Sequence, residues 1–281
     1  MRYSFSGHES FHCKSLWLKK GYDFIYDKKC FTDIDSVVQL GVGKNMVSSI
    51  RFWMKAFSLT KEDKLTDLAH YFFNDNTGRD LFCEDIATLW VLHYNLVYSQ
   101  IASLYKLVFV DFQRERKFFD KTQLQSFIKR KCSVAEQKNV FNENTVSKDI
   151  NVFLQNYVEP SDLKQLERFS ALLIKLGLIQ EFSKGVYRFQ EIPSNSIPNA
   201  IVLYALSNMK GEDKLLSFDK IQELSLIFCI PITSFLEKIR EIADLYPKFL
   251  EYSDNSGIRN IYFKENNKNL NLLDIYYNHE V

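Results

Sequence analysis

Three polar residues near the start of the chain, His8, Glu9 and His12, have the types and spacing of a zinc-binding motif. In zinc proteases H-E-x-x-H lies on a helix, so that both histidines face one metal ion and the glutamate activates a water molecule. The elongated protease pattern also needs a glycine and a third histidine, but Ser15 and Leu18 occupy those positions. A zinc hydrolase is therefore a remote alternative, and the motif needs another explanation.

The same segment concentrates groups that suit phosphodiester cleavage. Cutting this bond requires an activated water, neutralisation of charge on the phosphorus centre and help for the leaving oxygen. A glutamate can bind a metal ion or act as base, a histidine can transfer a proton, and a lysine can stabilise a phosphate. The candidate catalytic residues are His8, Glu9, His12 and Lys14. The alternative is that the histidines hydrogen-bond the backbone and hold an N-terminal arm in place.

A second polar group follows a turn that NDNTGRD predicts. Asp80 or Cys83 precedes a buried helix expected over about 84–98, and carboxylates at a helix start usually act as caps. Magnesium also prefers carboxylates and water to histidine. A magnesium ion would therefore need carboxylates to approach the histidines, and the candidate metal ligands are Glu9, Asp80, Glu84 and Asp85. Capping and metal binding both stay open for these carboxylates.

The elements that position these groups begin with two predicted helices joined by a glycine turn. Thr32, Asp33 and Asp35 provide capping chemistry for the first, Gly41 and Gly43 end it, and the apolar spacing over 44–57 predicts the second. This arrangement is typical of a helix-turn-helix. Its outward face would present Lys44, Asn45, Ser48, Ser49, Arg51 and Lys55 to DNA. An ordinary solvated helix face is the alternative.

The strongest local surplus of positive charge lies over 114–131, which holds seven basic and two acidic residues. Clustered basic side chains are the electrostatic signature of nucleic-acid binding. The further candidate DNA-binding residues are Arg114, Arg116, Lys117, Lys129, Arg130 and Lys131. Here too, a solvated helix face is the alternative.

The second half of the chain predicts repeated helix, turn, helix, hairpin units. One has a helix starting near Asn144 or Thr145, a helix ended by Gly177 and a hairpin turning at 183–185. The next has two helices hinged near Pro231 and a hairpin turning at 254–257. We expect a mainly α fold of helix-turn-helix or winged-helix-like units with short β-hairpin wings, divided into 1–104, 105–195 and 196–281. Winged helices bind DNA but also dock proteins.

Composition limits the functional classes. The 281 residues are 46% hydrophobic and 25% charged, as in an ordinary globular protein. The net charge of +1 means that any DNA binding must come from a local basic face. Five scattered cysteines argue against a disulfide framework, and with no 18-residue apolar run we expect a cytoplasmic protein without membrane partners.

Three motifs carry a resemblance to a known family. They are GHESFHCKSLWLKKG over 7–21, VVQLGVGKNMVSSIRFWMKAF over 37–57 and GRDLFCEDIATLWVLH over 78–93. Together they resemble the B component of Ssp-type DNA phosphorothioation systems, which belongs to a domain family long described as of unknown function. The resemblance covers about the first hundred residues well and the rest loosely.

The resemblance implies a metal-dependent DNA nicking component, which opens one strand so that partners can exchange a backbone oxygen for sulfur. The implied partners are double-stranded DNA, a cysteine desulfurase and ATP-dependent sulfur-transfer proteins, and the implied ion is magnesium. This chain departs from the family pattern at Leu81, where members commonly carry proline after the aspartate that corresponds to Asp80. The alternative is a non-catalytic DNA-binding or assembly subunit of the same system.

Overall fold

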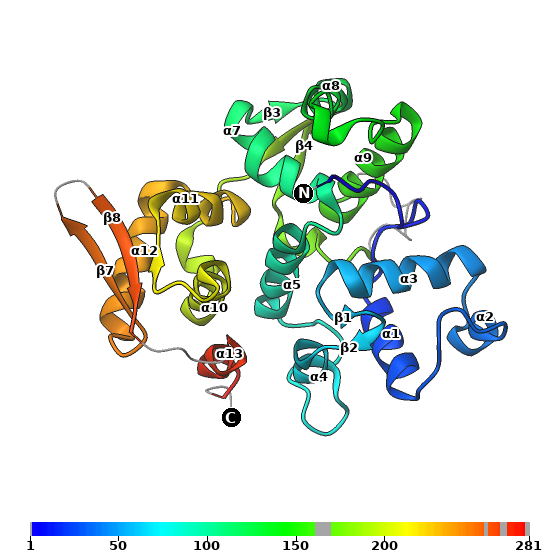
Figure 1. Ribbon diagram of the computed structural model, residues 1–281, viewed down its shortest axis with the longest axis horizontal. Helices are drawn as coiled ribbons and strands as arrows, with labels where there is room; N and C mark the ends of the chain where they lie inside the picture. Colours follow the sequence, from blue (N-terminus) through cyan, green and yellow to red (C-terminus); the bar gives the residue numbers. More distant parts are fainter. Residues whose placement is uncertain (1, 161–169, 256–257, 265–268, 279–281) are drawn as a thin grey trace. The chain divides into compact units, whose positions relative to one another are not determined.

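The computed structural model describes residues 2–160, 170–255, 258–264 and 269–278 (Figure 1). The described chain is mostly helical, and its strands form small antiparallel sheets of at most three strands, which confirms the predicted mainly α class. The chain divides into two compact units, Met1–Gln190 and Glu191–Val281. The predicted boundary at 195 lies near this division, whereas the predicted boundary at 104 falls inside the first unit.

The N-terminal part of the first unit consists of short helices around one longer amphipathic helix (Figure 1). Its elements are α1 (Trp17–Tyr26), α2 (Ser36–Leu40), α3 (Lys44–Ala56), β1 (Thr60–Lys61), β2 (Lys64–Leu65), α4 (Asp67–Phe73) and α5 (Ile86–Ser99). Gly41 adopts a left-handed conformation with φ of 63° and ends α2, so the predicted glycine turn between α2 and α3 is confirmed. The two strands form a hairpin directly after α3.

Helix α3 is the centre of this part. Its inner face buries Val47, Ile50, Trp53 and Met54, and it packs against α1 and α5. A Cβ atom at Gly21 of α1 would lie 2.8 Å from Cγ of Met54, so the glycine lets the two helices approach closely. Fully burying each large apolar side chain contributes roughly 1.5–3 kcal/mol, which holds the inner face against the core and leaves the polar face outside.

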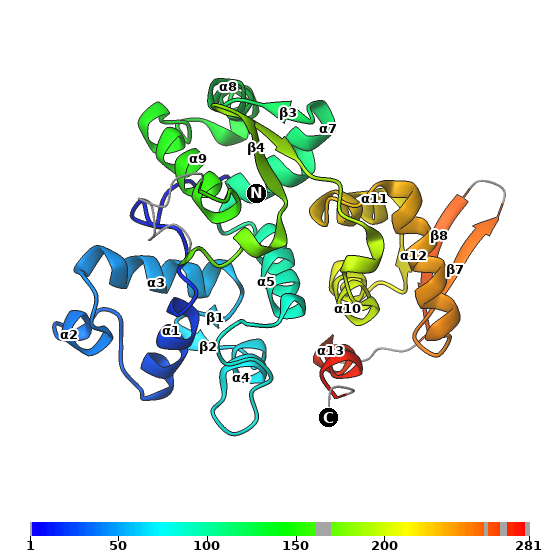
Figure 2. The same cartoon turned by 180° about the vertical axis from the view of Figure 1, so that it is seen from behind.

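The rest of the first unit follows the order helix, strand, two helices, hairpin (Figure 2). Its elements are α6 (Ser103–Lys106), η1 (Leu107–Phe112), α7 (Gln113–Glu115), β3 (Phe118–Phe119), α8 (Lys121–Lys131), η2 (Ala135–Gln137), α9 (Glu143–Tyr157), η4 (Ile174–Leu176), β4 (Ile179–Ser183) and β5 (Val186–Phe189). The sheet order is β3-β5-β4, so the first strand pairs with the last. Residues 118 and 119 pair antiparallel with 188 and 187.

The structure bears on two predicted helix boundaries in this part. Helix α9 begins at Glu143, close to the predicted start near Asn144 or Thr145, because the Asn142 side chain accepts a hydrogen bond from the Thr145 N–H and caps the helix there. The helix predicted to end at Gly177 lies partly in 161–169, outside the described residues. Its described end is the short 3₁₀ turn η4, and the hairpin that follows is confirmed.

The second unit has the same order of elements. They are η5 (Ser194–Ser196), α10 (Asn199–Lys210), β6 (Leu215–Leu216), α11 (Phe218–Ile227), α12 (Ile232–Leu245), β7 (Leu250–Asn255), β8 (Ile258–Phe263) and α13 (Asn269–Tyr277). The predicted hinge near Pro231 and the predicted hairpin are confirmed. The sheet order β6-β8-β7 matches β3-β5-β4, so one topology occurs twice in the chain. Helix α13 packs on α10.

All five cysteines are free, and only Cys30 is exposed, so the prediction that they form no disulfide framework is confirmed. Across the described residues, no helix has both the length and the apolar character needed to cross a membrane.

Gly78→Ala should destabilise the protein because a Cβ atom there would lie 2.5 Å from the Asn74 carbonyl oxygen and 2.6 Å from that of Phe72. Backbone atoms cannot move aside as side-chain ends can, so we expect a loss of about 1–3 kcal/mol in the free energy of unfolding. Chemical denaturation measures it. Gly43→Ala is the matched control, since a Cβ atom there meets nothing within 4 Å. Equal stability of the two variants would contradict this account.

Candidate functional site

The N-terminal motif forms a turn and not a helix. Gly7, Glu9 and Ser10 have positive φ angles of 102°, 47° and 64°. The Phe11 N–H donates to the His8 carbonyl at 2.8 Å, and the first helix starts only at Trp17. The zinc alternative therefore loses the helical geometry that would place both histidines on one metal ion.

His8 is buried, and both of its ring nitrogens are engaged. Its Nδ1 accepts a hydrogen bond from the Ser10 N–H at 3.2 Å, while its Nε2 lies 2.9 Å from Oδ1 of Asp149. Because Nδ1 accepts, the proton of the neutral ring sits on Nε2 and is donated to the carboxylate. This geometry agrees with the alternative in which the histidine anchors the N-terminal arm.

Asp149 on α9 is the residue that sequence reasoning missed. Its two oxygens also accept from the Ser6 N–H at 3.0 and 2.9 Å. On the other side, the Ser49 hydroxyl of α3 donates to the His8 carbonyl at 2.5 Å, and the His8 ring stacks on Trp53. The arm is thus held between α3 and α9. The available signal was an acidic residue on the apolar stripe of α9, next to Ile150.

The other three motif residues differ in exposure. His12 is buried with Nδ1 at 3.4 Å from Oε1 of Gln155, and Lys14 is half-buried with its ammonium 5.9 Å from the Trp17 ring centroid. Glu9 is exposed at the outside of the turn. Of the four candidate catalytic side chains, the glutamate is the one placed to reach a substrate without rearrangement.

The carboxylates before α5 act as caps. Asp80 accepts from the Glu84 N–H at 2.9 Å and the Asp85 N–H at 3.0 Å, and Asp85 accepts from the Ala87 N–H at 2.7 Å. Helix α5 therefore begins after Asp85, slightly later than predicted. Glu84 is exposed, and its backbone bond to Asp80 places the two residues side by side.

Among the described residues, no three His, Cys, Asp or Glu side chains gather in a way that holds a metal ion. Magnesium commonly takes only one or two protein carboxylates and completes its shell with water and substrate phosphate. Both Asp80 oxygens accept backbone N–H groups, and His8 already uses both ring nitrogens.

Two of the three motifs each bury a cysteine. Burial, and then the electrostatic effects of Asp80 and Cys13, raise the pKa of the Cys83 thiol well above its usual value. Burial alone raises the pKa of Cys13. Both thiols are therefore protonated at neutral pH and pack as small apolar groups.

Helix α3 presents an exposed polar row formed by Lys44, Asn45, Ser48, Arg51 and Lys55. The prediction that Ser49 belongs to this row is wrong, because its hydroxyl is fully buried against the arm. Arg51 is paired with Asp63 of the β1–β2 turn through Nε–Oδ1 at 2.9 Å and a second bond at 2.5 Å. This hydrogen-bonded guanidinium lowers the pKa of the Asp63 carboxyl.

A surface hollow of about 310 Å³ joins this row to the N-terminal turn. It is lined by Gly7, Ser48, Arg51, Phe52, Lys55, Glu62 and Asp63. Gly7 is required there because a Cβ atom would lie 2.6 Å from the Phe52 ring, and its φ of 102° is strained for other residues. The hollow therefore brings together two segments that carry the family resemblance.

The basic stretch over 114–131 is partly neutralised. Arg130 pairs with Glu115 at 2.5 Å, and Lys131 pairs with Asp111 at 3.3 Å. The remaining candidates of this stretch are exposed, namely Arg114, Arg116, Lys117 and Lys129. The two cations at the end of α8 already have acidic partners.

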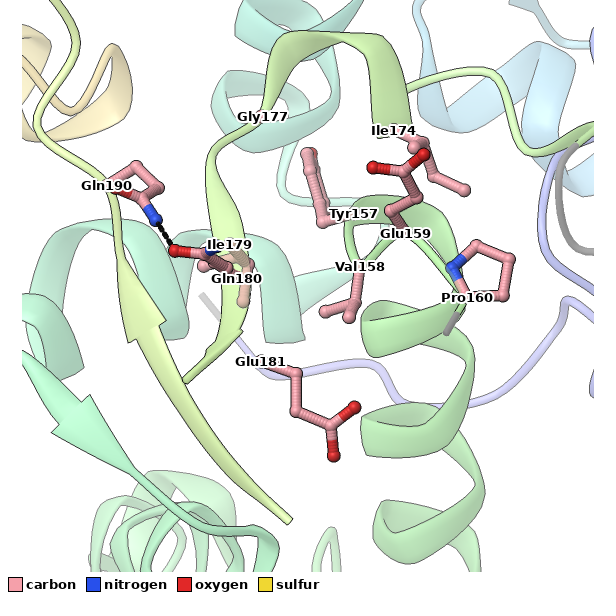
Figure 3. Close-up of a pocket in the computed structure, with 10 residues that line it drawn as sticks. All are labelled: Tyr157, Val158, Glu159, Pro160, Ile174, Gly177, Ile179, Gln180, Glu181 and Gln190. Atoms are coloured by element: carbon pink, nitrogen blue, oxygen red, sulfur yellow. Dashed lines mark hydrogen bonds between the residues drawn. The ribbon is translucent and has the colours of Figure 1, made fainter. Parts of the chain in front are cut away.

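A second hollow of about 420 Å³ lies between the end of α9 and strand β4 (Figure 3). It contains none of the predicted site residues. The carboxylates of Glu159 and Glu181 line it, and the Gln190 amide donates to the Gln180 amide oxygen at its edge. Its lining holds two carboxylates and no basic side chain to offset them, so this hollow is not a candidate for DNA.

Comparison with known proteins bears on the whole chain. The profile of a family described as "Protein of unknown function (DUF4007)" matches residues 5–277. A crystal structure of SspB superposes with a TM-score of 0.86 at 23% identity, covering 98% of this chain and 88% of SspB. A crystal structure of magnesium ion-bound SspB gives 0.85 at 22% identity with the same coverage. No curated protein matches the chain. These similarities confirm the resemblance that the sequence motifs indicated.

Asp149→Ala should loosen the N-terminal arm, because it removes the acceptor for the His8 imidazole and the Ser6 N–H. Leaving buried donors unsatisfied costs roughly 1–3 kcal/mol, and hydrogen exchange of the 4–12 amides should accelerate. Denaturation and exchange measured by NMR test both effects. Lys148→Ala, the exposed neighbour on α9, is the control and should change little. Unchanged exchange in the arm would show that the pair does not anchor it.

Proposed function

Because the chain belongs to the DUF4007 family and has the fold of SspB, we propose that it is a component of an Ssp-type phosphorothioation system that binds DNA and nicks it. The family and the fold are observations, and DNA binding and nicking are what the proposal adds to them. In such a system a nick would let sulfur-transfer proteins, supplied by a cysteine desulfurase and driven by ATP, exchange a backbone oxygen. Those proteins and double-stranded DNA are the proposed partners.

One observation carries the proposal. The 310 Å³ hollow places the turn that contains Gly7 beside Ser48, Arg51 and Lys55 on the exposed face of α3. The hollow also holds Glu62 and Asp63, and Asp63 is paired with Arg51. The Ser48 hydroxyl and the two cations suit a phosphate group, and an exposed helix after a short turn suits a groove of duplex DNA. The row on α3 would hold DNA where the exposed Glu9 of the same turn can reach the backbone.

The Arg51–Asp63 pair does not oppose this role. Both side chains are about half-exposed, at 45% and 53%, and exposed ion pairs contribute little to stability. A DNA phosphate can therefore replace Asp63 as the partner of the Arg51 guanidinium at small cost. Lys44 lies at the first turn of the helix, and Lys55 at the last, so the cations span the row.

The repeated helix, strand, two-helix, hairpin order is the basis for proposing two winged-helix modules. In the first unit, the basic side chains of 114–117 precede the module's first strand and favour DNA. In the second unit, the exposed side chains of α12 include Glu237, Glu241 and Asp244. Acidic residues on the helix that winged modules use for reading DNA favour protein docking there.

Magnesium is the proposed metal, and in the similar structure the ion is bound to SspB itself. When bound here, it would be held by carboxylates of the set Glu9, Asp80, Glu84 and Asp85, and it would neutralise charge on the phosphate. The chain's own exposed glutamate can accept the proton of the attacking water, and Lys14 can steady the phosphate after a small movement. His8 would orient the turn through its backbone contacts, and His12 lies behind it against α9.

The second candidate function is a non-catalytic DNA-binding or assembly subunit. The engagement of both His8 nitrogens and the acidic face of α12 favour it. Incubation of the pure protein with supercoiled plasmid separates the two candidates. Appearance of the open-circular form with magnesium, its loss with EDTA and its recovery on adding magnesium support nicking. Duplex binding without any open-circular product supports the second candidate.

Lys44→Ala should weaken duplex binding because an exposed cation of the α3 row is lost. The slope of log Kd against log salt should fall by roughly 0.9 for one lost phosphate contact. Fluorescence anisotropy over a salt series measures this slope. Lys248→Ala, an exposed lysine in the second unit, is the control and should leave the slope unchanged. Equal slopes for the two variants would show that the duplex interface does not include Lys44 of α3.

Glu9→Gln should keep the fold and duplex affinity but lower the nicking rate. The substitution preserves shape and removes the charge that a proton or a metal ion needs, and loss of a general base typically costs about 10²–10⁴-fold. The rate of plasmid relaxation measures nicking, and the melting temperature of each variant checks that the fold is intact. Glu62→Gln, an exposed glutamate on the rim of the same hollow, controls for loss of charge there. If Glu9→Gln nicks at the wild-type rate, Glu9 takes no part in nicking and the N-terminal turn has only a structural role.

A further inference from the structure

The sheet β3-β5-β4 has an exposed aromatic face that the proposed duplex interface does not use. Phe118 on β3 is 49% exposed and Phe182 on β4 is 60% exposed. The two rings pack edge to face with centroids 5.3 Å apart. The opposite face of the same sheet carries Phe119 and Phe189, which are buried in the core. Two large rings facing water side by side therefore need a reason beyond packing.

An arginine completes this face. Arg188 on β5 pairs across the strands with Phe118 on one side and Gln180 on the other. Its guanidinium lies 5.4 Å from the Phe182 ring centroid, and the Gln180 amide oxygen accepts from Nε at 3.1 Å and from a terminal nitrogen at 2.7 Å. The arginine is thus held between Phe182 and Gln180. We name Phe118, Gln180, Phe182 and Arg188 the aromatic platform.

The surroundings of the platform are basic. Exposed Arg114, Arg116 and Lys117 come immediately before β3, and exposed Lys184 lies in the β4–β5 turn. Among the nearby acids, Glu115 pairs with Arg130, while Glu181, which accepts from the Gly185 N–H, is one acidic side chain among these four basic ones. Stacking surfaces inside a positive field are the two features that single-stranded nucleic acid requires.

The second unit provides an internal comparison, because its sheet has the same order. Leu215, Tyr262 and Glu251 occupy the row that Phe118, Arg188 and Gln180 occupy in the first unit. That row has no guanidinium and contains a carboxylate, which pairs with Lys264 at 3.2 Å. The shared topology therefore does not require a pair of exposed rings with a guanidinium beside them.

We propose that the aromatic platform binds unpaired bases of single-stranded nucleic acid by stacking, while the neighbouring cations follow its backbone. Bases in a duplex are already stacked on one another, so the flat rings favour a strand that has been opened. This inference deepens the proposed function, on which it rests, by adding a site for an unpaired strand to the duplex site on α3. The edge-to-face ring pair would present one face for a base, and Arg188 a second.

The test measures Kd by anisotropy for the full-length protein with a labelled oligothymidylate of about 20 nucleotides and with a duplex of equal length. The Phe118→Ala/Phe182→Ala double variant should weaken single-strand binding roughly 5- to 150-fold for each stacked base lost, and leave duplex binding within about twofold. Phe182→Leu keeps an apolar side chain but removes the stacking surface, so it gives the same readout if the double variant folds poorly. Tyr262→Ala, an exposed aromatic on the equivalent sheet, is the matched control and should change neither Kd.

The outcomes are separable. If Phe182→Leu and the double variant bind single strands as tightly as the wild type, with unchanged melting temperatures, the aromatic platform does not bind unpaired bases. The exposed rings would then be a contact surface for another protein. Equal losses for single strand and duplex also overturn it, because they indicate a general electrostatic effect. A wild-type protein that binds single strands through the platform but never nicks plasmid contradicts only the proposed nicking. A wild-type protein that binds the duplex and not the single strand contradicts only the platform.

Discussion

The buried hydrogen bond between His8 and Asp149 is the contact on which the N-terminal site depends. It joins residues 141 positions apart and fixes the ring tautomer, since the Ser10 N–H occupies the other nitrogen. A charged acceptor inside the protein makes this a strong bond, and breaking it would leave a buried carboxylate uncompensated. Helix α9, which lies far from the N-terminus along the chain, therefore sets the position of the turn that exposes Glu9.

Helix α3 connects the anchored N-terminal arm to the proposed DNA-binding face. Its inner side receives the arm through Ser49 and Trp53, whose indole N–H donates to the Phe11 carbonyl at 3.1 Å. Its outer side carries the exposed cations. Because one helix holds both, the exposed cations and the N-terminal turn have a fixed spacing. A nicking centre needs such rigidity, since small displacements of reacting groups cost large factors in rate.

The repeated topology illustrates how one arrangement can take different surfaces. Both three-stranded sheets place their first strand beside their last and bury one face. On the other face, the first unit carries Phe118 and Arg188, whereas the second carries Leu215 and Tyr262. Backbone pairing decides the first property and side-chain identity the second, so shared topology does not imply a shared partner.

Much of the fold was readable from the sequence because its signals are local. Apolar spacing and glycine breaks predicted α2, α3 and the Pro231 hinge, and the composition predicted free cysteines. The site was less readable. The residues His8, Glu9 and His12 were visible in the sequence, but Gly7 and Ser10 with positive φ place them in a turn, which packs against Phe52 and Asp149. Ser49 looked exposed and is buried because the arm covers it. The sequence alone determined which segments are helical and which motifs the chain shares with its family, since both are encoded by neighbouring residues. Only the tertiary structure decided which polar groups are buried and hydrogen-bonded and which face solvent, because the hydrogen-bond partners of the buried groups lie far away along the chain.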